Sequence, residues 1–416
     1  MSRVTQTDFT GRLQDVAAAL LKLGATAYGG PAIMGVMQAE LQEKRRWVSK
    51  ERFLEGLSVA NMLPGATATQ LGIFLGYARG GWWGGLVAGL CFVLPAFVVM
   101  LALTIAYASV SVTPLARSAL YGLGPVVLGL FAVAVYRLGR SVAGTVPEAV
   151  IGVLAAAAFA GTPVGIVAIL LLSGGAGVLL FHPKKPRASV LVLASMAFLG
   201  VLSLVWWMTR SGPHAPVAGH VPDPNSLLEV GSYFFKVGAF TIGGGLTMIA
   251  FIQEQVVGQF GWLTPREFID GLALGQFTPG PILMIAAYVG YKVAGIAGAA
   301  VAATAAFLPS FIIMLAILPV LDRIRTLAWM RAAMKGMGPA VIGVLAVSLL
   351  RLAPYALPDP FAMVIMAATI VVLLNSRIGA FKLMVAGAIL GVLRSRLPAV
   401  AGFKAMGRLI ISSRVT

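Results

Sequence analysis

Long stretches without charge dominate the order of polar and apolar residues along the chain. Residues 82–110, 188–209 and 293–321 contain no Asp, Glu, Lys or Arg. A helix of about 20 apolar residues is long enough to cross the hydrocarbon core of a bilayer. The pattern therefore predicts an all-α, polytopic membrane protein.

The chain contains an internal repeat. An offset of 214 places residues 22–25, 29–30, 94–97 and 122–125 on similar residues at 236–239, 243–244, 308–311 and 336–339. One insertion, compensated further along, aligns Glu55 with Asp270 and residues 64–65 with 279–280. Regular self-similarity of this kind indicates duplicated structural units. We therefore predict a protein built from two homologous halves.

The repeat divides the chain into three parts. These are a first repeat (1–181), a linker with one unpaired transmembrane helix at 188–209 (182–225), and a second repeat (226–416). Each repeat holds six apolar segments, so with the unpaired helix we expect about 13 membrane segments. An odd number of crossings before the second repeat inverts it relative to the first.

The charges of the loops bear on this inversion. Loop 322–335 carries four basic residues where its equivalent, 111–117, carries one. Because cytoplasmic loops are the basic ones, this difference favours opposite sides. The basic residues 44–46 and the basic tail 394–414 argue the other way. On the loop difference we predict an inverted repeat.

Both halves begin with interrupted helices. The first apolar segment of each half is broken by glycines, at 29–30 and 243–245. The second apolar segment of the second half begins at the capping box Thr264-Pro265-Arg266-Glu267. In each half the second segment reaches Pro64 or Pro279 after roughly 15 residues, about 22 Å of helix, which is too short to cross. This segment is either a kinked crossing or a re-entrant hairpin.

Composition supports the membrane assignment and narrows the chemistry. The chain is 59% hydrophobic and 11% charged, whereas a soluble domain has about 25% charged residues. Its net charge of +17 is explained by basic loops that face anionic lipid, so no nucleic-acid partner is expected. With 31 basic and 14 acidic residues, the protein is better equipped to attract an anion than a cation.

Few residues suit a metal or a cofactor. The chain has one cysteine, Cys91, and its histidines, His182, His214 and His220, lie in Pro-rich polar segments. We therefore predict no metal site and no cofactor. A phosphate-binding GxxxxGK[ST] motif is also missing, which argues against an ATP-driven pump.

Helix breaks at matching positions in two repeats point to a transport site. A broken helix exposes backbone N–H groups and the positive end of its dipole, and glycine lets an oxyanion approach them closely. The candidates for substrate binding are Gly29, Gly30, Pro64, Gly65, Gly243, Gly244, Pro279 and Gly280. The alternative is that these glycines only allow close helix packing.

Polar residues near the breaks extend the candidate site. Lys22 and Lys236 each stand seven residues before a glycine pair, on the same helix face as its first glycine. A lysine there holds an anion, pairs with a carboxylate, or extends to the membrane surface. Asn61 and Gln276 stand three residues before each Pro-Gly, where they can bind substrate or cap the break.

Two acidic residues are candidates for proton coupling. Glu55 and Asp270 occupy equivalent positions in the middle of the short helix before each Pro-Gly. A charged residue inside a membrane segment is costly and is retained mainly for function. We predict that one or both bind and release a proton during transport.

The repeated motifs resemble those of the chromate ion transporter (CHR) family. They comprise the glycine break, a Trp before a short helix, Pro-Gly, the sequences FLGY and YVGY, and LPxF. The resemblance covers nearly the whole chain and is to the long, two-domain bacterial members. It implies an antiporter-like protein of the bacterial inner membrane that exports chromate, confers resistance and is driven by the proton motive force.

One departure and two alternatives accompany this resemblance. The second half has the family's Pro279-Gly280-Pro281, whereas the first half has Pro64-Gly65-Ala66, so the halves can contribute unequally. Chromate is a tetrahedral dianion similar to sulfate, so a carrier of sulfate or another oxyanion is the first alternative. A membrane-bound chromate reductase is the second, but the chain has no haem or flavin motif.

Overall fold

The structure is a computed structural model, and every element in the part it describes is helical. The described residues are 4–28, 31–110, 113–162, 164–181, 226–242, 245–320, 328–376 and 378–396. The predictions for Gly29, Gly30, Gly243, Gly244 and the unpaired helix at 188–209 lie outside these residues.

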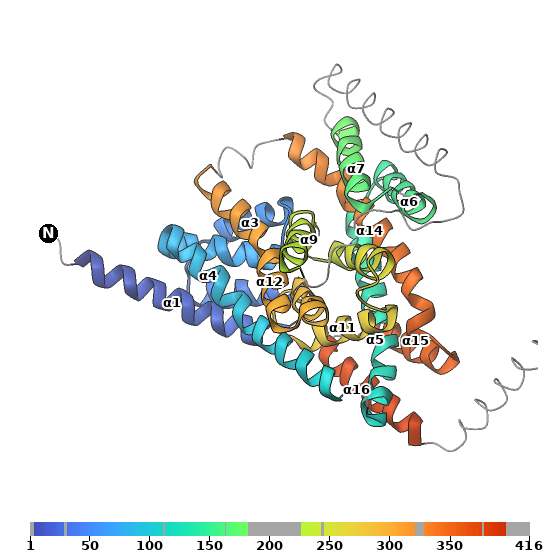
Figure 1. Ribbon diagram of the computed structural model, residues 1–416. Helices are drawn as coiled ribbons and strands as arrows, with labels where there is room; N and C mark the ends of the chain where they lie inside the picture. The colour runs from blue at the N-terminus through green and yellow to red at the C-terminus, as the bar shows by residue number, and fades with distance from the viewer. Residues whose placement is uncertain are drawn as a thin grey trace, which may run out of the picture.

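The two halves contain similar series of helices, and the described part of the second half has two additional 3-10 turns, η3 and η4 (Figure 1). The first half has α1 (Val4–Thr26), α2 (Pro31–Met37), η1 (Gln38–Lys44), α3 (Lys50–Met62), α4 (Thr67–Val110), α5 (Pro114–Val142), α6 (Val146–Gly161) and α7 (Ile166–Phe181). The second half has α9 (Leu227–Ala239), α10 (Thr247–Phe251), η2 (Ile252–Gln259), α11 (Pro265–Phe277), η3 (Ile282–Met284), α12 (Ile285–Ile317), η4 (Leu318–Val320), α14 (Ala328–Ala356), α15 (Pro360–Asn375) and α16 (Ala380–Arg396).

Four of the described helices are long and apolar enough to cross a membrane. They are Thr67–Ser109, Pro114–Val142, Ile282–Ile317 and Ala328–Ala356. Shorter apolar helices follow each pair of long ones, among them α6, α7 and α15. The chain is therefore a helical membrane protein, as the uncharged stretches predicted, while the expected number of about 13 membrane segments stays a prediction.

The first interrupted segment of each half folds back at its glycine break. On either side of the first break, Arg45 lies 2.5 Å from Asp15, and Lys22 lies 3.8 Å from Glu40. In the second half, the hydroxyl of Tyr233 donates to the Phe251 carbonyl oxygen at 3.3 Å. Because such partners stand at similar distances before and after the break, the two described arms lie side by side as a hairpin.

The second segment is a hairpin as well, which decides between the two predicted alternatives. Gly56 lies against the ring of Phe74, and Gly271 lies against the ring of Tyr288. A straight or kinked crossing would hold these residues about 27 Å apart at 1.5 Å per residue. The chain therefore runs inward along α3 or α11, turns at Pro-Gly, and returns along the start of the next helix.

A third turn follows inside α4 and α12. The backbone leaves the helical conformation at Gly81 (φ 63°) and Gly295 (φ 62°). Beyond this turn the chain folds back, so Gly76 lies against Gly84 and Gly290 lies against Gly298. The remaining part of each helix is long enough to cross the membrane. In Figure 1, α4 and α12 lie side by side in the middle of the molecule, where they pack together.

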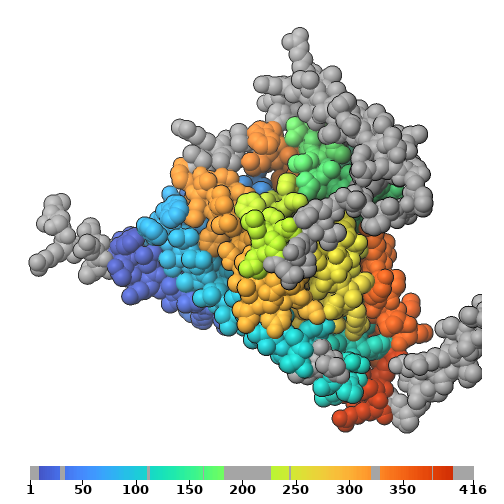
Figure 2. Space-filling model, in the orientation of Figure 1, coloured from blue at the N-terminus to red at the C-terminus, as the bar shows by residue number. Residues whose placement is uncertain are grey.

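The halves exchange their last helices. Helix α7 packs on α14 of the second half, and α16 packs on α5 of the first half. Both contacts depend on glycine: a Cβ on Gly122 would lie 1.9 Å from the Gly387 carbonyl oxygen, and one on Gly336 would lie 2.0 Å from that of Ser173. Figure 2 shows the consequence on the surface, where α16 (red) lies against α5 (teal) although they come from opposite ends of the chain.

Arginines reinforce this exchange. Arg351 of α14 donates to the carbonyl oxygen of Phe159 near the end of α6 at 2.9 Å, and Arg137 of α5 donates to that of Leu373 near the end of α15. A positive charge is favourable at a helix C-terminus. Since every such contact occurs twice with the halves interchanged, the halves are related by an approximate two-fold axis.

Candidate functional site

The hairpin tips of the two halves meet at the centre of the molecule. The N–H of Gly65 donates to the Thr241 carbonyl oxygen at 2.7 Å, and the N–H of Gly280 donates to the Ala27 carbonyl oxygen at 2.8 Å. Each Pro-Gly tip is therefore bonded to the glycine-break tip of the other half. Irregular backbone at this depth is tolerated only where it is buried in protein or lines a path for substrate.

Glycine is required at both Pro-Gly tips. Gly65 has φ +128° and Gly280 has φ +92°, values that residues with a side chain rarely adopt. A Cβ on Gly65 would also lie 2.6 Å from the Ser310 hydroxyl oxygen, and one on Gly280 would lie 2.8 Å from the Ala96 Cβ. The positions predicted from the repeat are thus fixed by backbone conformation and by the close approach of the opposite half.

The departure from the family motif is matched by a change across the interface. The N–H of Ala66 donates to the Ser310 hydroxyl at 2.8 Å. In the second half Pro281 stands at this position and has no N–H to donate, and the residue equivalent to Ser310 is Ala96. The donor and its acceptor are both present at the first-half tip and both missing at the second-half tip. The two tips are therefore chemically different.

Buried polar side chains gather in the turn that follows the first-half tip. Thr67, Thr69 and Gln70 open α4 and are 3%, 0% and 0% exposed. The Gln70 side-chain amide donates to the Pro64 carbonyl oxygen at 2.7 Å. Within the described residues, the Thr69 hydroxyl and Gln70 Oε1 have no hydrogen-bond partner. In the second half the corresponding stretch is apolar, with Ile282, Leu283 and Met284.

These residues were missed at the sequence level. Thr and Gln in an apolar helix are not unusual, and their importance depends on the tip that they adjoin. The available signal was that three polar residues follow Pro64-Gly65, whereas none follows Pro279-Gly280 within the corresponding stretch.

The two predicted amides lie near the tips without bonding to them. Asn61 is exposed and Gln276 is half-buried. Neither side chain makes a hydrogen bond within the part of the chain that the structure describes. Neither therefore caps a break in this structure.

The two predicted proton-coupling carboxylates differ in their surroundings. The side chain of Asp270 is 6% exposed, lies 3.4 Å from the Arg266 guanidinium, and accepts a 3.0 Å hydrogen bond from Tyr107, which belongs to the other half. The side chain of Glu55 is 33% exposed and forms a 2.8 Å ion pair with Arg52 in its own helix. Asp270 is thus enclosed at an interface between the halves, whereas Glu55 lies near the surface.

Both predicted lysines lie at the surface of the structure. Lys22 is paired at 3.8 Å with Glu40, which also accepts a hydrogen bond from Arg45 at 3.2 Å. The bond from Arg45, together with the charges of the two nearby lysines, lowers the pKa of Glu40. Lys236 is exposed. Neither lysine is enclosed beside the hairpin tips.

A second group of buried polar atoms lies on the π-helical turn η2 and in the loop that follows it. The Glu254 Oε2, Gln253 Oε1 and Trp262 Nε1 atoms are buried without a hydrogen-bond partner in the described part of the chain. The equivalent turn of the first half, η1, is π-helical too, but there Glu40 is paired with three basic residues. Such turns are frequent at functional sites.

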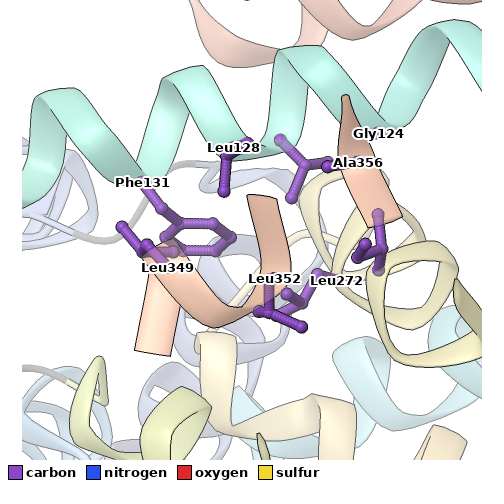
Figure 3. A pocket seen from close by; sticks show the side chains of 9 residues that line it. Gly124, Leu128, Phe131, Leu272, Leu349, Leu352 and Ala356 are labelled. Carbon is purple, nitrogen blue, oxygen red and sulfur yellow. The ribbon is translucent and has the colours of Figure 1, made fainter. Parts of the chain in front are cut away.

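The cavity in Figure 3 does not suit an oxyanion. It lies between α5, α11 and α14, and its lining consists of Gly124, Val127, Leu128, Phe131, Ile269, Leu272, Leu349, Leu352 and Ala356. These residues offer no polar side chain to an anion. Within the described ranges, no three His, Cys, Asp or Glu side chains lie close enough to hold a metal ion. The tips therefore remain the candidate site.

Comparison with known proteins identifies the family. The profile of the chromate transporter family matches residues 14–179 and again 228–392. The chain belongs to the chromate transporter family. Its two matches fall on the two halves that the repeat indicated.

Curated members of this family align over most of the chain. A probable chromate transport protein of Synechococcus elongatus is 35% identical, over 72% of this chain and 74% of its own length. Chromate transport proteins of Pseudomonas aeruginosa (32% identity; 81% of this chain and 80% of the relative) and Cupriavidus metallidurans (29%; 92% of each) also match. No solved structure matches the chain.

Proposed function

We propose that this chain is a secondary transporter that exports chromate from the cytoplasm across the bacterial inner membrane and so confers resistance to it. Membership of the chromate transporter family carries the proposal, because relatives named chromate transport proteins align over most of its length. The hairpin tips support it, since interrupted helices that meet inside an apolar protein are the usual setting of a transporter site.

In this proposal, chromate binds where the hairpin tips of the two halves meet. The substrate-binding residues are Gly29, Gly30, Asn61, Pro64, Gly65, Gly243, Gly244, Gln276, Pro279 and Gly280. Because the N–H groups of Gly65 and Gly280 already bond across the halves, these two glycines position the tips. Other N–H groups at the ends of the interrupted helices are then the donors for the anion. When these two hydrogen bonds between the halves break, the site opens toward one side of the membrane.

Asp270 is the proposed proton-coupling residue, with Glu55 in a lesser role. A buried carboxylate is costly as an anion, so its charge depends on whether a proton or a cation is near. Asp270 accepts a hydrogen bond from Tyr107 of the other half, so a change in its protonation directly alters a contact between the halves. An inward proton flux through this residue would drive chromate outward.

Lys22 and Lys236 are proposed to act through charge. Since both are exposed, they attract a dianion toward the tips from the surface rather than enclosing it. Lys22→Met and Lys236→Met should reduce transport while the protein still reaches the membrane in normal amounts. Lys→Arg should retain part of the activity. Full transport by both methionine variants would remove the lysines from the mechanism.

One experiment tests export and its energy source together. Cells that express the protein and matched control cells receive radiolabelled chromate, with and without a protonophore. We expect several-fold less cellular chromate in the expressing cells, and we expect the protonophore to abolish the difference. Equal chromate contents in untreated cells would overturn the proposal of export, and a difference that survives the protonophore would overturn proton coupling.

Sulfate transport is the second candidate, because sulfate shares the shape and charge of the chromate dianion. A site made of backbone N–H groups and hydroxyls contacts both anions alike. We therefore expect excess sulfate to compete with labelled chromate in membrane vesicles. Transport that ignores a large sulfate excess would indicate a site built for features that only chromate has.

A further inference from the structure

We propose that the first turn of α4, with the Thr69 hydroxyl, is the oxyanion-binding element of this transporter, and that the second half has no equivalent. This inference rests on the proposed function, and it reduces the candidate site to one element in one half. It assigns the binding role to residues that the repeat pattern alone does not distinguish.

The first turn of α4 has unused donors. The first intrahelical hydrogen bond of α4 runs from the Gln70 N–H to the Ala66 carbonyl oxygen at 2.9 Å. The N–H groups of residues 67–69 precede it, so they have no acceptor within the helix. No other acceptor for them is present in the described part of the chain. These N–H groups project from the positive end of the helix dipole.

No side chain caps this turn. At other helices of the protein, Ser49, Thr113 and Thr264 stand at the N-cap and accept a hydrogen bond from the helix backbone. At α4 the N-cap is Ala66, which has no side-chain oxygen, and its own N–H is bonded to Ser310. A buried helix end without a cap is unusual and calls for another acceptor. An anion is such an acceptor.

The side chains of the turn provide a second, independent sign of a ligand. Thr69 and Gln70 are both fully buried, and the Thr69 hydroxyl and Gln70 Oε1 have no hydrogen-bond partner among the described residues. An unpaired polar atom at such a position costs free energy unless a ligand satisfies it. The Thr69 hydroxyl adds a donor to the three N–H groups.

Gln70 positions this element rather than donating to the anion. Its amide N–H₂ group holds the Pro64 carbonyl oxygen at 2.7 Å, which fixes the tip against the first turn of α4. Gln70 therefore orients the tip relative to the first turn of α4.

The second half cannot form the same element. Its helix begins with the 3-10 turn Ile282–Met284, in which the Met284 N–H donates to the Pro281 carbonyl oxygen at 3.0 Å. No Thr or Gln is present in that turn. The two-fold repeat thus supplies two similar hairpins, of which the first carries the buried hydroxyl and amide in the turn after its tip. One oxyanion per chain is the expected stoichiometry.

Three variants test this inference in the full-length protein, reconstituted in liposomes. Thr69→Val removes the hydroxyl and keeps the shape. Ala66→Ser supplies an N-cap oxygen that competes with the anion for the N–H groups. Thr104→Val is the matched control, because Thr104 lies in the same helix, is fully buried, and donates to the Met100 carbonyl oxygen. The rate of chromate transport at several concentrations gives the KM for chromate. Titration calorimetry with sulfate gives the Kd and the number of sulfate ions bound per chain.

We expect Thr69→Val and Ala66→Ser each to raise the KM for chromate and the Kd for sulfate roughly tenfold, the effect of losing one buried hydrogen bond to a charged ligand. Thr104→Val should change neither, and Ala66→Ser should not lower the melting temperature in detergent. Unchanged KM and Kd in both test variants, with active wild type, would overturn this inference and leave the transport proposal intact. Wild-type protein that binds one sulfate through Thr69 without moving chromate would instead overturn the transport proposal alone.

Discussion

Single residues at the hairpin tips differ between the halves in a coordinated way. Ala66 and Ser310 form a hydrogen bond across the halves, whereas Pro281 and Ala96 occupy the equivalent positions and form none. Losing one partner alone would leave a buried polar group unsatisfied, at a cost of about 1–3 kcal/mol. The Pro-Gly-Ala sequence of the first half is therefore a compensated change, consistent with a tip that has acquired its own role.

Substitution of the tip glycine is expected to be severe. Gly65→Ala adds a Cβ at φ +128° and within 2.6 Å of two buried polar atoms. The strained backbone and the overpacking together should cost about 2–5 kcal/mol and abolish transport. Gly35→Ala, where a Cβ meets nothing within 4 Å, should be harmless. Thermal stability in detergent measures both, and a Gly65→Ala variant as stable as Gly35→Ala would contradict this account of the tip.

The two carboxylates are expected to respond differently to mutation. Asp270→Asn removes the buried group that bonds to Tyr107, so transport should fall roughly tenfold or more and cease to depend on an imposed pH difference. Glu55→Gln removes a carboxylate that is 33% exposed, so the pH dependence should persist. Chromate flux in vesicles across a range of pH gradients measures this. A normal pH response in Asp270→Asn would exclude Asp270 from coupling.

What the sequence reveals about single residues depends on how far away their partners lie. The helix breaks at Gly65 and Gly280 could be predicted, because proline, glycine and the repeat mark them locally. Thr69 and Ser310 could not be predicted, since each is a common residue in an apolar helix. Ser310 acquires its role from Ala66, 244 residues away along the chain. Lys22 and Lys236 were conspicuous as charges, yet their exposed positions follow from how the hairpin arms are turned.

At the scale of helices, the sequence identified the breaks but not the direction of the chain after them. Glycine and proline interrupt a helix locally, whereas the contact of Gly56 with Phe74 decides that the chain turns back. Similarly, uncharged length predicted α4 and α12, but the turn at Gly81 depends on one positive φ angle. A helix break follows from the local sequence, whereas a hairpin depends on packing between segments that are farther apart along the chain.

The hairpins bear on the inversion of the repeat. Two hairpins return the chain to the side from which it started. The remaining crossings of the first half and the unpaired helix predicted at 188–209 therefore decide on which side the second half begins. Reporter fusions in the loops near residues 112 and 325 should therefore report opposite sides of the membrane. Fusions at 47 and 262, between the two hairpins of each half, provide a second pair with the same expectation. Two reporters on the same side would refute the inverted arrangement.

At the scale of the whole molecule, each half completes the other. Helices α6 and α7 of the first half pack on α14, and α15 and α16 of the second half pack on α5. The long helices α5 and α14 are therefore each covered by helices of the other half. The repeat predicted two similar units, but it contained no sign that their last helices are exchanged. Glycines at 122, 177, 336 and 391 recur at the offset of the repeat, and only the structure shows that they face the opposite half.

This exchange predicts how the protein behaves when it is divided. Fragments 1–181 and 182–416, the second of which keeps the linker, should each accumulate poorly when expressed alone. When co-expressed, they should co-purify and restore chromate transport, because the exchanged helices bind the fragments together without a peptide link. The measurements are co-purification through a tag on one fragment and chromate accumulation in the cells.

A substitution within the exchanged contact makes this prediction specific. Gly336→Ala in the second fragment places a Cβ 2.0 Å from the Ser173 carbonyl oxygen of the first, which should force α7 away from α14 and prevent co-purification. Gly275→Ala, where nothing lies within 4 Å, should leave assembly intact. If fragment 1–181 were stable by itself, or if Gly336→Ala assembled as well as Gly275→Ala, the halves would be independent units that merely adjoin. Loss of assembly with Gly336→Ala alone would mean that the exchanged helices, which lie apart from the hairpin tips, hold the two halves together.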